Sequence, residues 1–203
     1  KVCGSGLKAI ALGAAAIMLG QAEVIVAGGQ ENMSLAPMAL PKARWGLRMG
    51  DATLVDVMTH DGLFCAFDHC TMGESSDHKN RALGIDRLEQ DEWAARSHAR
   101  AAEATASGHF AKEIAPVEVP QRKGDPVVFA RDEFPRAGTT AEKLAGLRPA
   151  FKKDGSVTAG NASGINDGAA AVVVMTADKA AALGLSPIAK IVSPQNATFA
   201  AGI

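Results

Sequence analysis

Residues 7–19 constrain the fold of this chain most strongly, because the stretch is apolar on nearly every face and rich in alanine and glycine. Such a composition is typical of a helix that packs closely against neighbours on all sides. The stretch is well short of the ~20 residues that a membrane-spanning helix needs. After Gly20, residues 24–27 read Val-Ile-Val-Ala, a pattern typical of a short buried strand. Together the two segments predict a central core helix in an α/β fold.

Cys3 stands directly before this helix and is followed by the small residues Gly4, Ser5 and Gly6. Unpaired backbone N–H groups and the helix dipole favour a thiolate over a thiol at such a position. A surface helix end contributes only ~0.3–1 kcal/mol, so a nucleophilic Cys3 needs a neighbouring base as its partner. Taken alone, Cys3 better fits an ordinary buried cysteine that caps a core helix.

The composition favours an enzyme of a reducing compartment. The chain has 203 residues, 47% of them hydrophobic, and a net charge of −1, which gives no electrostatic basis for binding nucleic acid. Its three cysteines are an odd number with no signal peptide ahead of them, so a disulfide framework is not expected and a cytoplasmic location is. Cys65, His69 and Cys70 lack the paired spacing of a zinc site, and no metal site is expected.

Three stretches of different character follow one another along the chain. Residues 1–33 are expected to be the end of one core half, which carries Cys3. Residues 34–163 form a long insertion with mixed signals, and residues 164–203 are expected to start another core half. In this last part, residues 171–175 predict a buried strand, residues 177–183 a helix and residues 188–192 a further strand.

Within the insertion, two patterns predict regular structure. Asp86 and Glu89 have the spacing of a capping box, which predicts a helix that runs to about Ser107 and stops at Gly108. Residues 117–119 and 127–129 are β-prone runs that flank the turn-forming sequence Arg-Lys-Gly-Asp, and they predict a hairpin.

Two sequence blocks carry a resemblance to a known family. Residues 3–9, Cys-Gly-Ser-Gly-Leu-Lys-Ala, and residues 27–34, Ala-Gly-Gly-Gln-Glu-Asn-Met-Ser, resemble the thiolases around their acyl-accepting cysteine. Residues 147–151 and 157–170 resemble the thiolase segment that leaves the loop domain and enters the second core half. The blocks occur in the family's order and at about its spacing, and the resemblance runs along essentially the whole chain.

The resemblance implies a layered α/β/α/β/α core, incomplete in this chain, in which residues 34–163 are a loop domain that holds coenzyme A. In thiolases the cysteine that matches Cys3 attacks an acyl-CoA thioester and carries the acyl group. A second, deprotonated acyl-CoA then attacks the acyl-enzyme in a Claisen condensation, and the reverse reaction is thiolysis. The chain is most similar to the members that condense two acetyl-CoA molecules to acetoacetyl-CoA. Coenzyme A is then substrate and product, and no permanently bound cofactor is expected.

The family's substrate-binding residues carry over position by position. The resemblance implies that Ser163 lies near the pantetheine, with apolar neighbours at Ala159, Ala162 and Ile165. It implies contacts of Leu63 and Met72 with the acyl and pantetheine arms, of Phe151 with the same channel, and of Arg136 with the adenosine end. Each apolar residue among these also fits an ordinary core position.

The chain departs from the family in two ways. Thr71 occupies the position before Met72 where many biosynthetic thiolases have a histidine, which leaves the acyl-chain preference open. The downstream thiolase motifs Asn-Glu-Ala-Phe, Gly-His-Pro and Cys-Gly-Gly do not occur, and the five histidines are all in contexts unlike that of the catalytic histidine. We therefore expect an internal stretch of a thiolase, inactive by these residues alone, from a homodimer or homotetramer without a membrane anchor.

Three alternatives remain open at the level of the sequence. One is a degradative 3-ketoacyl-CoA thiolase, and another is a thiolase-like lipid-binding protein that does not condense acyl groups. The third reads residues 4–9 as the dinucleotide-binding pattern G-x-G-x-x-A of an NAD-linked oxidoreductase. That pattern requires a preceding strand and an acidic residue at the end of the next strand, whereas Glu23 precedes its strand.

Overall fold

The computed structural model describes residues 1–192, and the chain divides into two compact units. The first unit contains residues 1–64 together with the chain from Ile165 onward, and the second contains residues 65–164. Each unit is described by itself. The three-part division at residues 34 and 164 stays a prediction.

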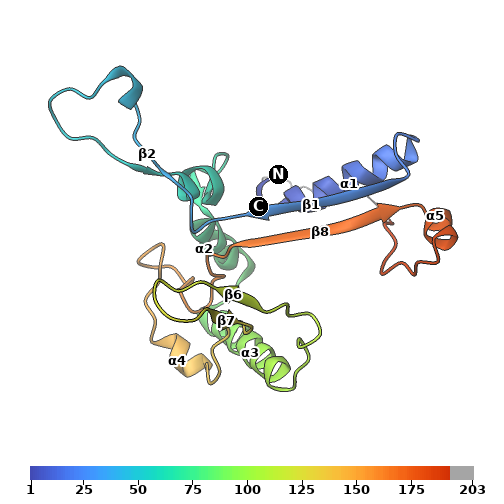
Figure 1. The fold of residues 1–203 in the computed structure, drawn as a ribbon. Helices are drawn as coiled ribbons and strands as arrows, with labels where there is room; N and C mark the ends of the chain where they lie inside the picture. The colour runs from blue at the N-terminus through green and yellow to red at the C-terminus, as the bar shows by residue number, and fades with distance from the viewer. Residues whose placement is uncertain (193–203) are drawn as a thin grey trace. The chain divides into compact units, whose positions relative to one another are not determined.

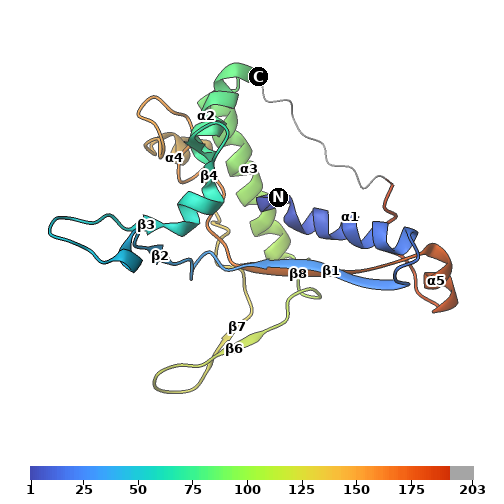
Figure 2. The same cartoon turned by 90° about the horizontal axis from the view of Figure 1, so that it is seen from above.

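A helix on a two-stranded sheet forms the centre of the first unit (Figure 1). The 3₁₀ turn η1 (Val2–Gly4) leads directly into helix α1 (Ser5–Met18). Strands β1 (Val24–Glu31) and β8 (Gly168–Met175) are antiparallel along their whole length, as Figure 2 also shows. The helix packs on both strands, and a Cβ at buried Gly13 would lie 3.2 Å from the Ile25 side chain, so glycine permits a close approach.

The elements predicted for this unit form with one exception, but the burial predicted for the core helix and the two strands is wrong. Of the residues of α1, β1 and β8, only Gly13, Ala27 and Val174 are buried, because one helix covers only one face of a two-stranded sheet. The predicted core helix is α1, the predicted strand at 24–27 is β1, and the predicted strand at 171–175 is β8, each somewhat longer than expected. The predicted helix at 177–183 is α5 (Ala177–Ala182). The strand predicted at 188–192 is wrong, because these residues have no regular structure and Ile188 is fully exposed. An extended segment is stabilised when its backbone N–H and C=O groups bond to a neighbouring strand, and residues 188–192 do not pair with one in the described chain.

The rest of the first unit consists of short elements. Strands β2 (Met38–Ala39) and β3 (Val55–Asp56) pair in antiparallel fashion around the 3₁₀ turn η2 (Ala43–Trp45). A π-helix, η3 (Met58–Leu63), follows, and strand β4 (Phe64–Cys65) continues the chain into the second unit. The side-chain carboxylate of Asp56 accepts the backbone N–H of Met58 at 3.0 Å, which fixes the entry into η3.

The second unit contains two long helices. Strand β5 (Cys70–Thr71) precedes helix α2 (Met72–Leu83), which begins with a capping box between Thr71 and Glu74. Helix α3 (Arg87–Ala106) begins with the predicted capping box of Asp86 and Glu89, and its predicted end before Gly108 is confirmed. Helix α2 was not predicted, although Thr71 and Glu74 have the same capping-box spacing as Asp86 and Glu89.

A hairpin and a short helix complete the second unit. Strands β6 (Val117–Val119) and β7 (Val127–Phe129) pair in antiparallel register, which confirms the predicted hairpin. Helix α4 (Ala141–Ala145) contacts α3. Among residues 1–192, none of the helices has the length and apolar character that crossing a membrane requires.

Candidate active site

Cys3 lies where the sequence predicted it, in the turn that opens α1. The backbone N–H of Gly4 donates to the Lys1 carbonyl at 2.9 Å, and the N–H of Ser5 donates to the Val2 carbonyl. The Cys3 side chain is exposed. Val2 has a φ of 45°, a region that β-branched residues rarely adopt, and such strained backbone is concentrated at functional sites.

A hollow of about 1170 Å³ lies beside Cys3 within the first unit. Four segments line it: the start of α1, the end of β1 with the loop that follows, η3, and the first residues of β8. Leu63 lines the hollow as Cys3 does, so the structure brings these two predicted site residues together. Ile165 is 58% exposed, and the neighbouring Asn166 lines the hollow.

A hydrogen bond holds the rim of this hollow. The backbone N–H of Ser34, just beyond β1, donates to the Asp167 carboxylate at 3.0 Å, just before β8. This bond, reinforced by the Ser34 hydroxyl, holds the pKa of Asp167 below its usual value. The two strands that end at the hollow are thus tied together by a side chain as well as by their backbone ladder.

Ala159, Ala162 and Ser163 lie in the second unit, on a turn that is buried on one side. Val157 and Thr158 are buried, whereas Ala159 and Ser163 are exposed and Ala162 is half-buried. Two of the three residues of this turn that are predicted to contact the pantetheine, Ala159 and Ser163, are therefore exposed to solvent.

Asp77 of α2 anchors the chain just before this turn. Its Oδ1 atom accepts the backbone N–H groups of Ser156 at 2.7 Å and of Val157 at 3.0 Å, and the Ser156 hydroxyl at 3.2 Å. Asp77 is only 3% exposed, and a Cβ at Gly155 would collide with its carboxylate. The role of Asp77 could not be predicted from local sequence patterns, because it depends on a pairing between residues far apart in the chain.

Phe151 lies against the start of α2, near Met72. A Cβ at Gly73 would collide with the Phe151 ring, so the ring packs against the backbone beside Met72. Met72 is 41% exposed and Phe151 is 44% exposed. The structure thus brings these two predicted residues into one neighbourhood of the second unit.

Thr71, the departure from the family's histidine, has a structural role here. Its hydroxyl donates to Glu74 Oε2 at 2.9 Å, and its backbone N–H donates to the same oxygen at 2.8 Å. These bonds, the one from the backbone most of all, hold the pKa of Glu74 below its usual value. Thr71 therefore starts α2 with its polar atoms engaged by the capping box.

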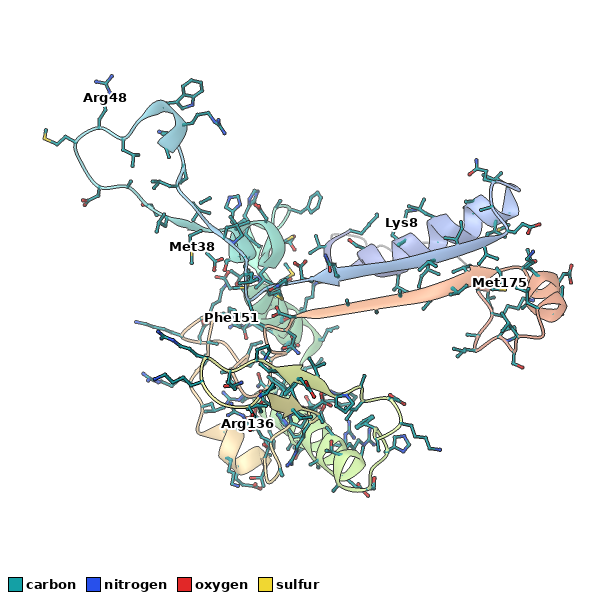
Figure 3. The ribbon with its side chains drawn as sticks, in the orientation of Figure 1. Lys8, Met38, Arg48, Arg136, Phe151 and Met175 are labelled. Carbon is teal, nitrogen blue, oxygen red and sulfur yellow. The ribbon has the colours of Figure 1, made fainter. Side chains whose placement is uncertain are left out.

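Arg136 lies on the loop that precedes α4. Its backbone N–H donates to His98 Nδ1 at 3.2 Å, and the His98 ring stacks on Phe134 with 6.2 Å between the ring centroids. Its carbonyl accepts the Thr139 hydroxyl at 2.8 Å. These contacts fix the backbone of Arg136 and leave its side chain exposed (Figure 3).

The other two cysteines have different surroundings. Burial, together with the carboxylates of Asp68 and Glu74, raises the pKa of the Cys70 thiol and so favours its unreactive form. Cys65 Sγ accepts the Asp68 backbone N–H at 3.4 Å. Within residues 1–192, three or more His, Cys, Asp or Glu side chains do not gather in a group that could hold a metal ion.

Comparison with known protein families gives a decisive result. The profile described as "Thiolase, N-terminal domain" matches residues 1–178. The chain belongs to the thiolase family. The resemblance of the sequence blocks around Cys3 and Ser163 is thereby confirmed.

Two curated thiolases illustrate how similar the relatives are. The acetyl-CoA acetyltransferase of Pseudomonas aeruginosa is 61% identical over 95% of this chain and 49% of its own length. The acetyl-CoA acetyltransferase of Cupriavidus necator is 57% identical over 97% of this chain and 50% of its own length. The chain thus spans about half the length of the curated thiolases it matches.

Solved thiolase structures confirm the predicted α/β fold class. The acetyl-CoA acetyltransferase of Bacillus anthracis superposes with a TM-score of 0.82 at 49% identity, covering 91% of this chain and 46% of that one. The enzyme of the same name from Syntrophomonas wolfei superposes with a TM-score of 0.84 at 43% identity, with the same coverage. The roles of Cys3 and of the substrate-contacting residues in this thiolase stay predictions.

Proposed function

We propose that the full-length protein is an acetyl-CoA acetyltransferase that works through a Cys3 acyl-enzyme. The observation that carries the proposal is the 61% identity, over 95% of this chain, to the Pseudomonas aeruginosa enzyme of that name. The exposed thiol at the start of α1, beside a hollow of about 1170 Å³, supports it.

In the proposed first step, the Cys3 sulfur attacks the thioester carbonyl carbon of acetyl-CoA. A new carbon–sulfur bond forms, the bond to the CoA sulfur breaks, and coenzyme A leaves as its thiol with the proton from Cys3. The carbonyl oxygen gains negative charge in between, and backbone N–H groups at a helix N-terminus are suitable donors for such an oxyanion. In the second step, the deprotonated methyl carbon of another acetyl-CoA attacks the acyl-enzyme, which gives acetoacetyl-CoA and returns the thiol.

The base for these steps is proposed to come from outside the segment that this chain spans. All five histidines stand in contexts unlike the family's catalytic histidine. Among the described contacts, His60 Nδ1 is 2.7 Å from Asp61 Oδ1, and His78 Nε2 is 2.6 Å from Lys152 Nζ. We place the activating groups in the remaining half of the relatives' length.

The substrate contacts are part of the same proposal. Leu63 is proposed to border the acyl group from the rim of the hollow. Met72 and Phe151 are proposed to border the channel in the second unit, where Ser163 with Ala159 and Ala162 approaches the pantetheine. Ile165, the first residue of the chain's return to the first unit, is proposed as a further apolar neighbour of the pantetheine. Arg136 is proposed at the adenosine end, with coenzyme A as substrate and product instead of a bound cofactor.

The compartment, the oligomeric state and the metabolic role of the enzyme are part of the same proposal. We propose a cytoplasmic homodimer or homotetramer that serves fatty acid metabolism. A degradative 3-ketoacyl-CoA thiolase differs from the proposed enzyme in accepting long acyl chains, so rates of thiolysis against chain length separate the two.

The deciding experiment is the intact mass of the full-length protein before and after incubation with acetyl-CoA, followed by peptide mapping. We expect one added acetyl group on the peptide that contains Cys3. Cys3→Ala should abolish the adduct and the condensation, whereas the matched variant Cys65→Ala should keep both. An unmodified wild-type protein, or an acetyl group that persists in Cys3→Ala, would contradict the proposed mechanism.

A further inference from the structure

We propose that Asn161 and Asp91 are positioning residues that set the affinity for coenzyme A. They hold the turn that carries Ala159, Ala162 and Ser163 in the conformation that receives the pantetheine arm. The inference rests on the proposed function, since it concerns the substrate site of that enzyme. Neither residue is placed in contact with the substrate, and both act through the turn.

The Asn161 side chain closes the turn from inside. Its Oδ1 atom accepts the backbone N–H of Thr158 at 2.7 Å, and its Nδ2 atom donates to the Ser156 carbonyl at 3.1 Å. The same Nδ2 atom donates to Asp91 Oδ1 at 2.9 Å. Because two of these partners are acceptors and one is a donor, only an amide can serve all three, and only in this orientation.

Asp91 fixes Asn161 to the helical part of the second unit. It is 1% exposed, and its second oxygen accepts Arg87 Nε at 2.7 Å. The Arg87 guanidinium donates further to the carbonyls of Leu144 at 2.7 Å and Leu147 at 3.1 Å, at the end of α4. A carboxylate so deeply buried is stable only while its hydrogen bonds are kept, so it has little freedom to shift.

Thr158 secures the turn from its other side. It is completely buried, and its hydroxyl accepts the N–H groups of Gly160 at 3.2 Å and Asn161 at 3.3 Å. Its carbonyl accepts the N–H of Ala162 at 3.1 Å. The inner side of the turn is thus saturated with hydrogen bonds, whereas Ala159 and Ser163 remain exposed.

This contrast within one short turn indicates pre-organisation. A loop that is ordered before the ligand arrives does not lose that conformational entropy on binding, and affinity rises accordingly. Asn161→Asp removes the donor that Asp91 Oδ1 and the Ser156 carbonyl share, and it sets two carboxylates side by side. The turn must then move, and the contacts of Ala159 and Ser163 with the pantetheine move with it.

The test compares Asn161→Asp with the exchanged pair Asp91→Asn/Asn161→Asp in the full-length protein, with coenzyme A as the probe. We expect the Kd for coenzyme A, measured by calorimetry, to rise about tenfold in Asn161→Asp. In the exchanged pair, the amide at position 91 donates to the carboxylate at position 161 and its oxygen still accepts Arg87. The contact between the two side chains is thereby restored, whereas the bond to the Ser156 carbonyl stays lost. We therefore expect a partial recovery, to a Kd about threefold above that of wild type.

Two controls separate positioning from general loss of structure. Asp86→Ala removes the N-cap of α3 without touching the turn, so it should lower the melting temperature and leave the Kd unchanged. The rate at which iodoacetamide alkylates Cys3 should be the same in all these variants, since this reagent does not use the coenzyme A site.

An Asn161→Asp protein that binds coenzyme A like wild type would overturn the inference, as would a folded exchanged pair whose Kd stays raised tenfold. If Asn161→Asp does not fold, the exchanged pair alone decides. The acetylation of wild-type Cys3 tests the proposed function separately from the positioning role. If wild-type Cys3 is acetylated but Asn161→Asp binds coenzyme A as tightly as wild type, only the positioning role is refuted.

Discussion

The two units of this thiolase are built by different means. In the first unit the buried side chains are apolar and small, such as Ala27, Val174 and Ala180. In the second unit, Asp77, Asp91 and Thr158 are the buried polar side chains of the described chain. The second unit also buries the apolar side chains of Cys70, Leu144 and Val157. The first unit is thus held by strand pairing and close backbone packing, whereas the second adds hydrogen bonds of buried polar side chains to its apolar packing.

This difference indicates where each unit tolerates change. Strand pairing uses backbone groups that every residue has, so the first unit is sensitive mainly to side-chain volume at points of close approach. A buried carboxylate serves specific donors, so the second unit is sensitive to the chemistry of single residues. Predicted substrate contacts occur in both units, with Leu63 in the first and Ser163 in the second.

The largest loss of stability in the second unit is expected for Asp77→Ala. The substitution leaves the buried N–H groups of Ser156 and Val157 without their acceptor, and we expect a cost of about 3 kcal/mol. Amide hydrogen exchange at these two residues, together with thermal unfolding, measures the loss. The matched control is Asp154→Ala, whose exposed carboxylate pairs with Arg81 and should contribute far less. Equal losses from the two variants would show that the second unit does not depend on its buried carboxylate more than on an exposed one.

The corresponding test of the first unit compares two neighbouring glycines of β1. A Cβ at Gly28 would lie 2.5 Å from the Ala170 carbonyl oxygen, whereas a Cβ at Gly29 would have no neighbour within 4 Å. We expect Gly28→Ala to destabilise the protein by about 1–3 kcal/mol, because the backbone of β8 must shift. Gly29→Ala should change the melting temperature little. If both variants melt at the same temperature, the close approach of β1 to β8 does not determine the stability of this unit.

The same contrast explains which parts of the structure the sequence could predict. Helix α1, strands β1 and β8, and the β6–β7 hairpin all follow from local apolar patterns and turn residues, and these predictions are confirmed. The antiparallel pairing of β1 with β8 was not predicted, because it joins segments separated by the whole second unit. Local patterns specify an element but not its distant partner.

The candidate site divides in the same way. The place of Cys3 at the start of a helix follows from the residues beside it. The roles of Asp77 and Asp91 could not be predicted, since each bonds a segment about seventy or eighty positions away. In the sequence these two aspartates look like ordinary polar residues of helices, and only the fold shows that they are buried.

The smallest effect on stability is expected when acid protonates two accessible carboxyl groups, Asp167 in the first unit and Glu74 in the second. The Thr71 backbone N–H, above all, holds the pKa of Glu74 below 4.5, and the Ser34 backbone N–H does the same for Asp167 below 3.8. A carboxyl whose pKa is lowered on folding stabilises the folded state above its unfolded pKa. That contribution is lost as the pH falls through the lower, folded value. Both units should therefore lose stability in acid, with full stability retained near pH 7.

Paired variants separate the two contributions. Glu74→Gln and Asp167→Asn keep an acceptor oxygen but do not titrate, so each should flatten the acid dependence of the amide signal of its own donor. The NMR shift of the Thr71 amide between pH 7 and pH 2 should follow Glu74, and that of the Ser34 amide should follow Asp167. If the Thr71 amide titrates identically in Glu74→Gln, the capping box is not the source of the acid sensitivity of α2. If Asp167→Asn alters the Thr71 titration, the two units do not respond to acid independently.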